Sequence, residues 1–383
     1  MPNQARHAVL PDQTHDEAAR EAFCGSLRKL FTETLWPGVR DVYEDVHRPS
    51  FERRTGHAPS DVREVREALE PSFFYRAANL VGRSAQELLW DTVGESVERQ
   101  LDGLDRAAAS IADPKGSMRL DPDVAVPRYL DMVDIHVMPG NFHRELGPGD
   151  VYAAALYDRG VYQFAYGGMG EDNEGLGRAM TGWFAENFPD FRPRRILDMG
   201  CGCGFSTLSW KRLYPDAEVH GIDISAPMVR YAHARAESMG VAVHLSQQDA
   251  AHTDFPDGHF DVVTSCLLTH ENPVPQIRAM FAESHRLLGD GGMMLIDGAH
   301  PPAADHEDEF FTTWFNYNAN EPFAVGLRKL DLAEAFATAG FPTEAYFTSG
   351  AREAVYLKGM AGGKTRRAAS AGYRGTIKRA RTG

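Results

Sequence analysis

The second half of the chain alternates short apolar runs with amphipathic stretches. From Arg195 onward, runs such as RILDMG, AEVHGID and FDVVTSCLL are followed by segments whose apolar positions recur at helical spacing. Strands separated by helices form parallel sheets, because each helix carries the chain back across one face of the sheet. We therefore predict an α/β fold with a doubly wound sheet. The runs EAYFTS and EAVYLKG predict two further strands near the C-terminus.

The first half is predicted to be mostly helical, between residue 16 and about residue 112. Ser84 and Glu87 have the spacing of a capping box, and a helical apolar pattern follows them. Proline and glycine then accumulate up to about residue 150, which predicts a connector. We predict a helical domain over residues 1–165, an α/β domain over residues 166–358 and a tail over residues 359–383.

Length and composition narrow the class of protein. The chain has 383 residues, enough for two buried cores. It has no run of about 18 apolar residues and no apolar leader segment, so we expect a cytoplasmic protein without membrane contact. Its four cysteines lack the spacing of a disulfide framework, which is consistent with a reducing compartment.

The charge is distributed unevenly. After Glu353 there are eight Lys or Arg residues and no acid, so the preceding residues hold 32 basic residues against 54 acids, a net charge of -22. A body with this charge repels polyanions, which argues against a nucleic-acid partner.

Residues 196–207, ILDMGCGCGFST, combine three glycines with two cysteines. Cys201 and Cys203 have no second ligand pair nearby to complete a zinc site, so we predict no metal here. Gly200, Gly202 and Gly204 follow a predicted strand and open a helix, where the absence of a Cβ allows close approach of a cofactor. Their spacing differs from the Gly-x-Gly-x-x-Gly of NAD-binding loops. The loop therefore predicts a nucleotide-like cofactor other than NAD.

Two further acidic residues lie at the ends of the next predicted strands. Asp223 comes 25 residues after Asp198, where a carboxylate can accept hydrogen bonds from both ribose hydroxyls of a nucleoside. Asp249 is placed to accept from an adenine amino group. Each aspartate alone also fits a turn or a helix cap. Together, at neighbouring strand ends, they favour an adenosyl cofactor.

On these residues, the stretch from about 195 to 300 resembles the class I S-adenosylmethionine-dependent methyltransferases. The resemblance implies a Rossmann-like, seven-stranded sheet ending in a reversed hairpin, and S-adenosyl-L-methionine as cofactor. It implies that LDMGCGCG lies under the methionine part, that Asp223 binds the ribose, and that Ile224, Asp249 and Ala250 contact adenine. Cys203 departs from the Thr, Ser or Pro often found at its position, a change compatible with binding through the backbone. The predicted cofactor contacts are Asp198, Gly200, Cys201, Gly202, Gly204, Asp223, Ile224, Met228, Asp249, Ala250, Cys266 and Tyr166.

The methyl acceptor is expected just past the strand FDVVTSC. The stretch LLTHEN resembles the loop at the rim of the active site in small-molecule O-methyltransferases, in which a histidine is the general base. We predict His270 as the base, oriented by a carboxylate that is either Glu271 or a residue from the N-terminal half. A rim residue without a catalytic role is the alternative for His270.

Aromatic and histidine residues elsewhere suggest the walls of the acceptor pocket, including the stretch DEFFTTWFNYN. The aromatic residues before the α/β domain fit equally well as a core between two domains. His136 and His143 have no third metal ligand near them in the sequence, so no metal is predicted there. The predicted substrate contacts are Tyr162, His136, His143 and His300.

The resemblance implies methyl transfer to a small-molecule acceptor, and we predict O-methylation of a hydroxyl in specialised metabolism. The helical domain is expected to cover the acceptor and to offer a surface for a homodimer. SCLLTHENP lacks the Pro-Pro-aromatic motif of base amino-methyltransferases. RNA cytosine-C5 methyltransferases place a proline before their nucleophilic cysteine, whereas here Ser265 precedes Cys266. Both observations argue against a nucleic-acid acceptor. Two alternatives stay open: a cofactor-binding protein with a regulatory role, and a protein or peptide methyltransferase that docks through its N-terminal helices.

The tail provides a first test. Residues after about Gly362 are basic with almost no apolar content, which predicts a solvated extension; contact with nucleic acid or a membrane is the alternative. A chain truncated after Gly362 should therefore melt within about 2 °C of the full chain and keep its cofactor affinity. A larger loss in thermal unfolding or calorimetry would show that the tail docks.

Overall fold

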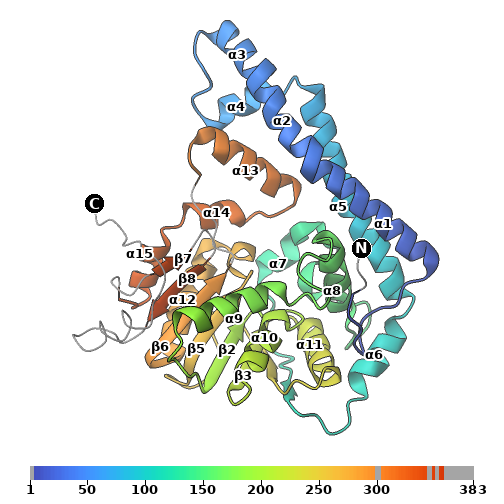
Figure 1. Ribbon diagram of the computed structural model, residues 1–383, viewed down its shortest axis with the longest axis vertical. Helices are drawn as coiled ribbons and strands as arrows, with labels where there is room; N and C mark the ends of the chain where they lie inside the picture. The colour runs from blue at the N-terminus through green and yellow to red at the C-terminus, as the bar shows by residue number, and fades with distance from the viewer. Residues whose placement is uncertain (1–3, 298–302, 343–346, 350–352, 358–383) are drawn as a thin grey trace.

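The computed structural model describes residues 4–297, 303–342, 347–349 and 353–357, so the predicted tail and His300 lie outside the described residues. Figure 1 shows the arrangement of the elements. The helices are α1 His15–Leu30, α2 Trp36–Val42, α3 Arg48–Thr55, α4 Val62–Leu69, α5 Phe73–Glu98, α6 Leu101–Ala109, α7 Arg128–Met132, α8 Tyr152–Phe164, α9 Gly175–Asn187, α10 Phe205–Leu213, α11 Ala226–Ser238, α12 Val274–Leu287, α13 His306–Asn318, α14 Ala324–Lys329 and α15 Leu332–Thr338. The strands are β1 Ser117–Arg119, β2 Arg195–Met199, β3 Glu218–Asp223, β4 His244–Gln247, β5 Phe260–Cys266, β6 Leu288–Asp297, β7 Phe347–Ser349 and β8 Glu353–Leu357.

The sheet confirms the predicted α/β architecture. In the described chain its order is β1-β4-β3-β2-β5-β6-β8-β7, and β8 runs antiparallel to both β6 and β7. The region after Arg195 therefore supplies seven strands with a reversed hairpin, as the resemblance implied. An eighth strand, β1, comes from the predicted connector and pairs in parallel with β4.

The two faces of the sheet bury alternate residues of each strand, as the two-residue period of a strand requires. Ile196, Val219 and Val262 pack under α9, α10 and α11 on one face. Their neighbours, including Leu197 and Val263, pack under α12 and α15 on the other. Helices cover both faces of the sheet, so a ligand can reach the sheet at the carboxyl ends of its strands.

The helices α1–α5, residues 15–98, form a long arm beside the sheet, which we call the N-terminal arm (Figure 1). From α1 to α3 the chain is continuously helical, interrupted by π turns at Phe31–Leu35 and Tyr43–His47. Each π turn precedes a proline, Pro37 or Pro49, which has no N–H to donate to the preceding turn.

The long helix α5 corrects one sequence expectation. Its N-cap is Ser72, whose side chain accepts from the backbone N–H of Tyr75, so the helix begins before Ser84. Ser84 and Glu87 lie inside the helix, where Glu87 accepts from Arg83 Nε at 2.6 Å. The predicted capping box is wrong because the apolar pattern continues upstream of Ser84.

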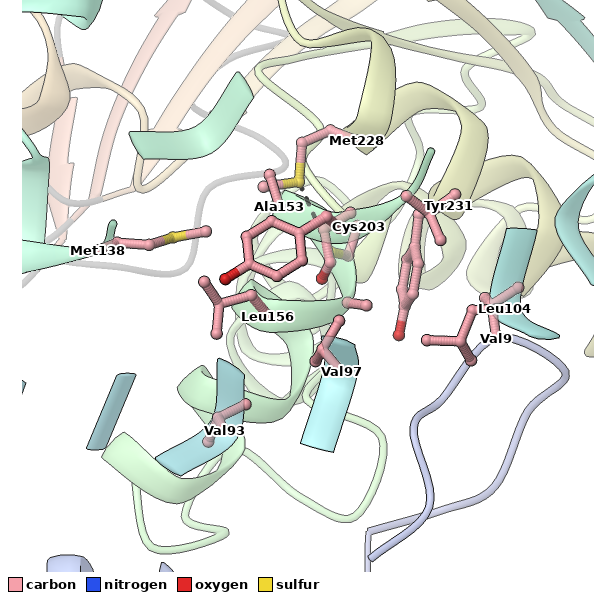
Figure 2. Close-up of a cluster of buried hydrophobic side chains, with 14 of the residues drawn as sticks. Val9, Val93, Val97, Leu104, Met138, Ala153, Leu156, Cys203, Met228 and Tyr231 are labelled. Carbon is pink, nitrogen blue, oxygen red and sulfur yellow. Dashed lines mark hydrogen bonds between the residues drawn. The ribbon is translucent and has the colours of Figure 1, made fainter. Parts of the chain in front are cut away.

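The two predicted domains share buried cores. Figure 2 shows one such cluster, in which Val93 and Val97 of α5 and Leu156 of α8 meet Met228 and Tyr231 of α11. A second cluster joins the arm to α13, the helix that follows β6. There the ring of Trp36 stacks on Trp314 with centroids 4.2 Å apart. Among the described helices, none has both the length and the apolar character needed to cross a bilayer.

A buried ion pair fixes the helices on one face of the sheet. Glu174, at the N-cap of α9, is fully buried and accepts from Arg235 of α11 at 2.9 Å, and it also pairs with Arg212 of α10. Arg235 is itself 1% exposed, so Glu174 neutralises a guanidinium that water does not reach. One carboxylate therefore ties together three helices.

Replacing Glu174 by glutamine should destabilise the protein by about 3–5 kcal/mol, because the change leaves the Arg235 charge buried and unpaired. Chemical unfolding of Glu174→Gln would measure the loss, with the exposed Glu186→Gln as the matched control. Equal stability of the two variants would contradict a structural role for the pair.

Candidate functional site

The glycine loop turns sharply at the carboxyl end of β2. Gly200, Gly202 and Gly204 have φ angles of +66°, +50° and +81°, a region that side-chain-bearing residues rarely adopt. A Cβ at Gly200 would lie 2.6 Å from the side chain of Leu268, so the loop that follows β5 can pack here only against glycine. A Cβ at Gly202 would meet nothing within 4 Å. The backbone at Gly202 therefore forms an open floor on which a ligand can rest.

Asp223, the last residue of β3, holds this floor in place. Its Oδ2 accepts from the backbone N–H of Gly202 at 2.9 Å, and its Oδ1 accepts from the N–H of Ser225 at 2.9 Å. Burial raises the pKa of Asp223, although these backbone hydrogen bonds oppose the rise. The carboxylate lines the cleft next to Ile224, as a ribose-binding residue must.

Asp198 lies beneath the loop rather than in the cleft lining. It is fully buried, and its Oδ2 accepts from the hydroxyls of Ser206 at 2.5 Å and Thr207 at 2.6 Å. Burial raises its pKa to about 6. Asp198 thus fastens the end of β2 to the first turn of α10. Gly204 is the N-cap of that helix, and Cys201 packs into the core under α10 and α11.

The cleft at the ends of β2, β3 and β4 contains most of the predicted cofactor contacts. Asp249 accepts from Gln276 Nε2 at 2.9 Å, and both line the cleft. The predicted residues found in its lining are Gly200, Gly202, Asp223, Ile224, Met228, Asp249, Ala250 and Cys266.

The cleft also has a wall that the sequence did not reveal. Pro127, Tyr129 and Leu130 of the connector cover it, and the hydroxyl of Tyr129 donates to Asn272 Oδ1. His143, predicted as a substrate contact, lies in this lining and pairs with Asp131 at 2.9 Å. Pro127, Tyr129 and Leu130 approach through tertiary packing alone, and no motif in the sequence marks these three residues.

A second cavity, of about 580 Å³, adjoins the cleft. It lies between the N-terminal arm, α8, α13 and the strand ends, and it shares Tyr157, Leu267 and Glu271 with the first lining. As expected, the stretch DEFFTTWFNYN contributes to its wall, through Thr312, Phe315 and Asn316. The aromatic residues of the lining are Trp36, Trp90, Phe142, Tyr157, Phe164 and Phe315.

Where the two cavities meet, one carboxylate lies between two histidines. Glu271 Oε1 is 2.8 Å from His136 Nε2 and 3.1 Å from His270 Nε2. His136 Nδ1 is 3.3 Å from Glu321 Oε1. We call His136, His270, Glu271 and Glu321 the histidine–glutamate cluster. The sequence placed the first three among the site residues, but Glu321 was missed.

The electrostatics of the cluster favour charged side chains. Burial opposes protonation of His136, but Glu271 and Glu321 outweigh it and raise the pKa of His136 to about 10. Burial also opposes ionisation of Glu271, but His136 and His270 hold its pKa well below the usual range. The cluster therefore holds an imidazolium and a carboxylate at neutral pH.

The backbone around the cluster is strained. His136 and Leu267, on two different segments, have φ angles of +54° and +58°. Such conformations cost about 1–3 kcal/mol each and persist only where the surroundings impose them. The carbonyl of His136 accepts from Gln86 Nε2 at 2.9 Å and from Trp90 Nε1 at 2.8 Å, so α5 holds this segment in place.

The cluster also has the donor set of a metal site. Ligand atoms of His136, His270 and Glu271 lie within 4.8 Å of one another. The sequence offered His136 no third ligand because Glu271 lies 135 residues away and meets it only in the folded chain.

Five predicted contacts lie outside the linings of both cavities: Asp198, Cys201 and Gly204, described above, and the tyrosines Tyr162 and Tyr166. Tyr162 is 1% exposed and packs near Arg159. Tyr166, predicted as a cofactor contact, lies near Thr32 and Arg28 of the N-terminal arm. Both tyrosines therefore contact the helical half rather than the cofactor cleft.

Comparison with known proteins agrees with the geometry of the cleft. Residues 196–292 match the family model described as a methyltransferase domain. The chain is 37% identical over 110 residues to the demethylmenaquinone methyltransferase of Thermus thermophilus, which covers 29% of this chain and 49% of that protein. It is 37% identical over 115 residues to the nocamycin O-methyltransferase of Saccharothrix syringae, covering 29% of this chain and 40% of that protein.

A third relative is the ajmaline N-methyltransferase of Rauvolfia serpentina, 38% identical over 112 residues, covering 28% of this chain and 37% of that protein. The chain thus spans less than half the length of each of these relatives. The family model spans the glycine loop, Asp223 and Asp249. Together with the fold, these matches identify residues 196–292 as a class I S-adenosylmethionine-dependent methyltransferase domain.

Proposed function

We propose that the protein transfers a methyl group from S-adenosylmethionine to a hydroxyl of a small-molecule acceptor in specialised metabolism. The observation that carries the proposal is the junction of the two cavities at the histidine–glutamate cluster. A ligand in the cleft and an acceptor in the second cavity would meet beside His270 and Glu271. The cleft residues fit the cofactor, because Asp223 offers a carboxylate and Gly202 an open backbone.

S-adenosylmethionine, when bound, supplies a methyl group on a positively charged sulfur. In an in-line displacement the carbon–sulfur bond breaks as the carbon–oxygen bond forms, so the chain's main task is to align the acceptor and take its proton. We assign proton removal to His270, because an imidazole side chain can accept a proton near neutral pH. Glu271 contacts His270 Nε2 and would stabilise the imidazolium formed there. His136 keeps Glu271 ionised.

The size of the second cavity supports a small acceptor. Elements of both halves line it, including Trp36 from the arm and Phe315 from α13, and its volume of about 580 Å³ suits a small molecule. A regulatory cofactor-binding protein would not need a second cavity at the junction. The acceptor atom stays a proposal, since the relatives include both an O- and an N-methyltransferase by name.

The cofactor assignment is tested at Asp223. The change Asp223→Ala should weaken binding of S-adenosylhomocysteine by about 1–3 kcal/mol, because the ribose hydroxyls lose a buried acceptor. Calorimetry would measure the loss, with Asp216→Ala, an exposed aspartate before β3, as the control. A folded wild-type protein that binds NAD tightly, or no adenosyl ligand at all, would refute the assignment.

The base is tested at His270. The change His270→Ala should lower turnover roughly 10²- to 10⁴-fold while leaving S-adenosylhomocysteine affinity nearly unchanged. Release of S-adenosylhomocysteine with a fractionated metabolite extract would measure turnover, and His15→Ala, on an exposed histidine, is the control.

Three outcomes would change this role. Equal loss of cofactor binding would make His270 a structural residue, and full turnover would remove it from the mechanism. The third concerns the donor set at the cluster: turnover that a chelator abolishes and a divalent cation restores would make His270 a metal ligand rather than the base.

A further inference from the structure

The second cavity contains a buried cation that forms no ion pair with a carboxylate of the described residues. Arg28, near the end of α1, lines the cavity and is 8% exposed. Its Nε donates to the carbonyl of Phe164 at 3.1 Å and its Nη1 to Gln86 Oε1 at 2.9 Å. Both acceptors are neutral. Among the residues that the structure describes, Arg28 forms no ion pair with a carboxylate, and Nη2 makes no hydrogen bond.

A guanidinium in this position needs an anion. Burying an unpaired charge is unfavourable by several kcal/mol, so buried arginines are normally paired. Here burial lowers the pKa of Arg28 to about 10; Tyr166 and Glu321 oppose this shift, and Glu321 contacts His136 rather than Arg28. The remaining acids of the lining, Glu271 and Asp297, lie at the cluster and at the end of β6. A bound anion would supply the missing partner of Arg28.

The surroundings of Arg28 favour an aromatic ligand. The guanidinium carbon lies 3.3 Å from the centroid of the Phe164 ring, and Trp36, Trp90 and Phe315 form further walls of the cavity. Flat aromatic walls bind planar rings by stacking and by edge contacts.

A chain of polar contacts links Arg28 to the cluster along one wall. Gln86 accepts from Arg28 and donates to the carbonyl of His136, whose ring contacts Glu271. An acceptor with an anionic group at Arg28 would therefore have its other end directed toward His270 and Glu271.

Building on the proposed function, we propose that the acceptor is a hydroxylated aromatic acid whose carboxylate pairs with Arg28. The guanidinium geometry suits a carboxylate, which can accept two parallel hydrogen bonds. The aromatic ring lies between the arm and α13, and the hydroxyl lies at the histidine–glutamate cluster. Arg28 is thus a specificity-determining residue and takes no part in the transfer of the methyl group or the proton.

The test compares an acid with its neutral analogue. Binding of 6-hydroxy-2-naphthoate and of 6-hydroxy-2-naphthamide is measured by calorimetry in saturating S-adenosylhomocysteine. The wild-type protein should bind the acid at least about tenfold more tightly than the amide, in line with a charge-assisted hydrogen bond. Arg28→Met should bind the two equally, and Arg28→Lys should keep part of the preference. Arg20→Met, on an exposed arginine of the same helix, should behave as the wild type.

Thermal unfolding and S-adenosylhomocysteine affinity of each variant show whether Arg28→Met still folds, and Arg28→Lys tests the charge independently. Equal binding of acid and amide by the wild type, absence of binding of either, or an unchanged preference in Arg28→Met would overturn the proposal. Each of these results leaves the proposed function standing if S-adenosylhomocysteine still binds. Failure of the wild type to bind S-adenosylhomocysteine would contradict the proposed function itself.

Discussion

The site depends on the burial of one carboxylate between groups from distant parts of the chain. Glu271 follows β5, His136 belongs to the connector, and Glu321 lies between α13 and α14. Moving a single carboxylate out of water costs several kcal/mol, and the attraction of a neighbouring imidazolium offsets the cost only at contact distance. The sheet, the connector and the segment after α13 must therefore dock together before the charges at the junction are satisfied. The same docking brings together the elements that line the second cavity.

The two halves of the chain also share buried hydrophobic cores. Residues of α5 and α8 share a core with α11 and with Cys203 of the glycine loop (Figure 2). Aromatic residues of α13 share another core with the arm. A change in the arm would reach the cofactor loop through side-chain contacts, because packed interiors transmit small displacements.

The sequence predicted those parts that depend on local patterns. Alternating apolar runs predicted the sheet, and the glycine spacing located the loop because positive φ angles need glycine. Asp198 was predicted as a cofactor contact, because the sequence could not tell whether its carboxylate faced the cleft or the hydroxyls of Ser206 and Thr207. Arg28 and Glu321 were missed because nothing in their neighbourhoods distinguishes them from surface charges. Their roles arise only when segments far apart in the sequence meet.

The strand β1 was missed for a different reason. Its three residues are exposed and have no apolar pattern, since an edge strand pairs through its backbone. Its position nevertheless matters for the solubility of the sheet. Without it, β4 would present a row of unsatisfied N–H and C=O groups on which a strand of another molecule could add. Ser117–Arg119 occupies that edge with a strand too short to extend the pairing, and Arg119 places a charge there, paired with Asp254 at 2.6 Å. The connector thus protects the sheet against edge-to-edge aggregation.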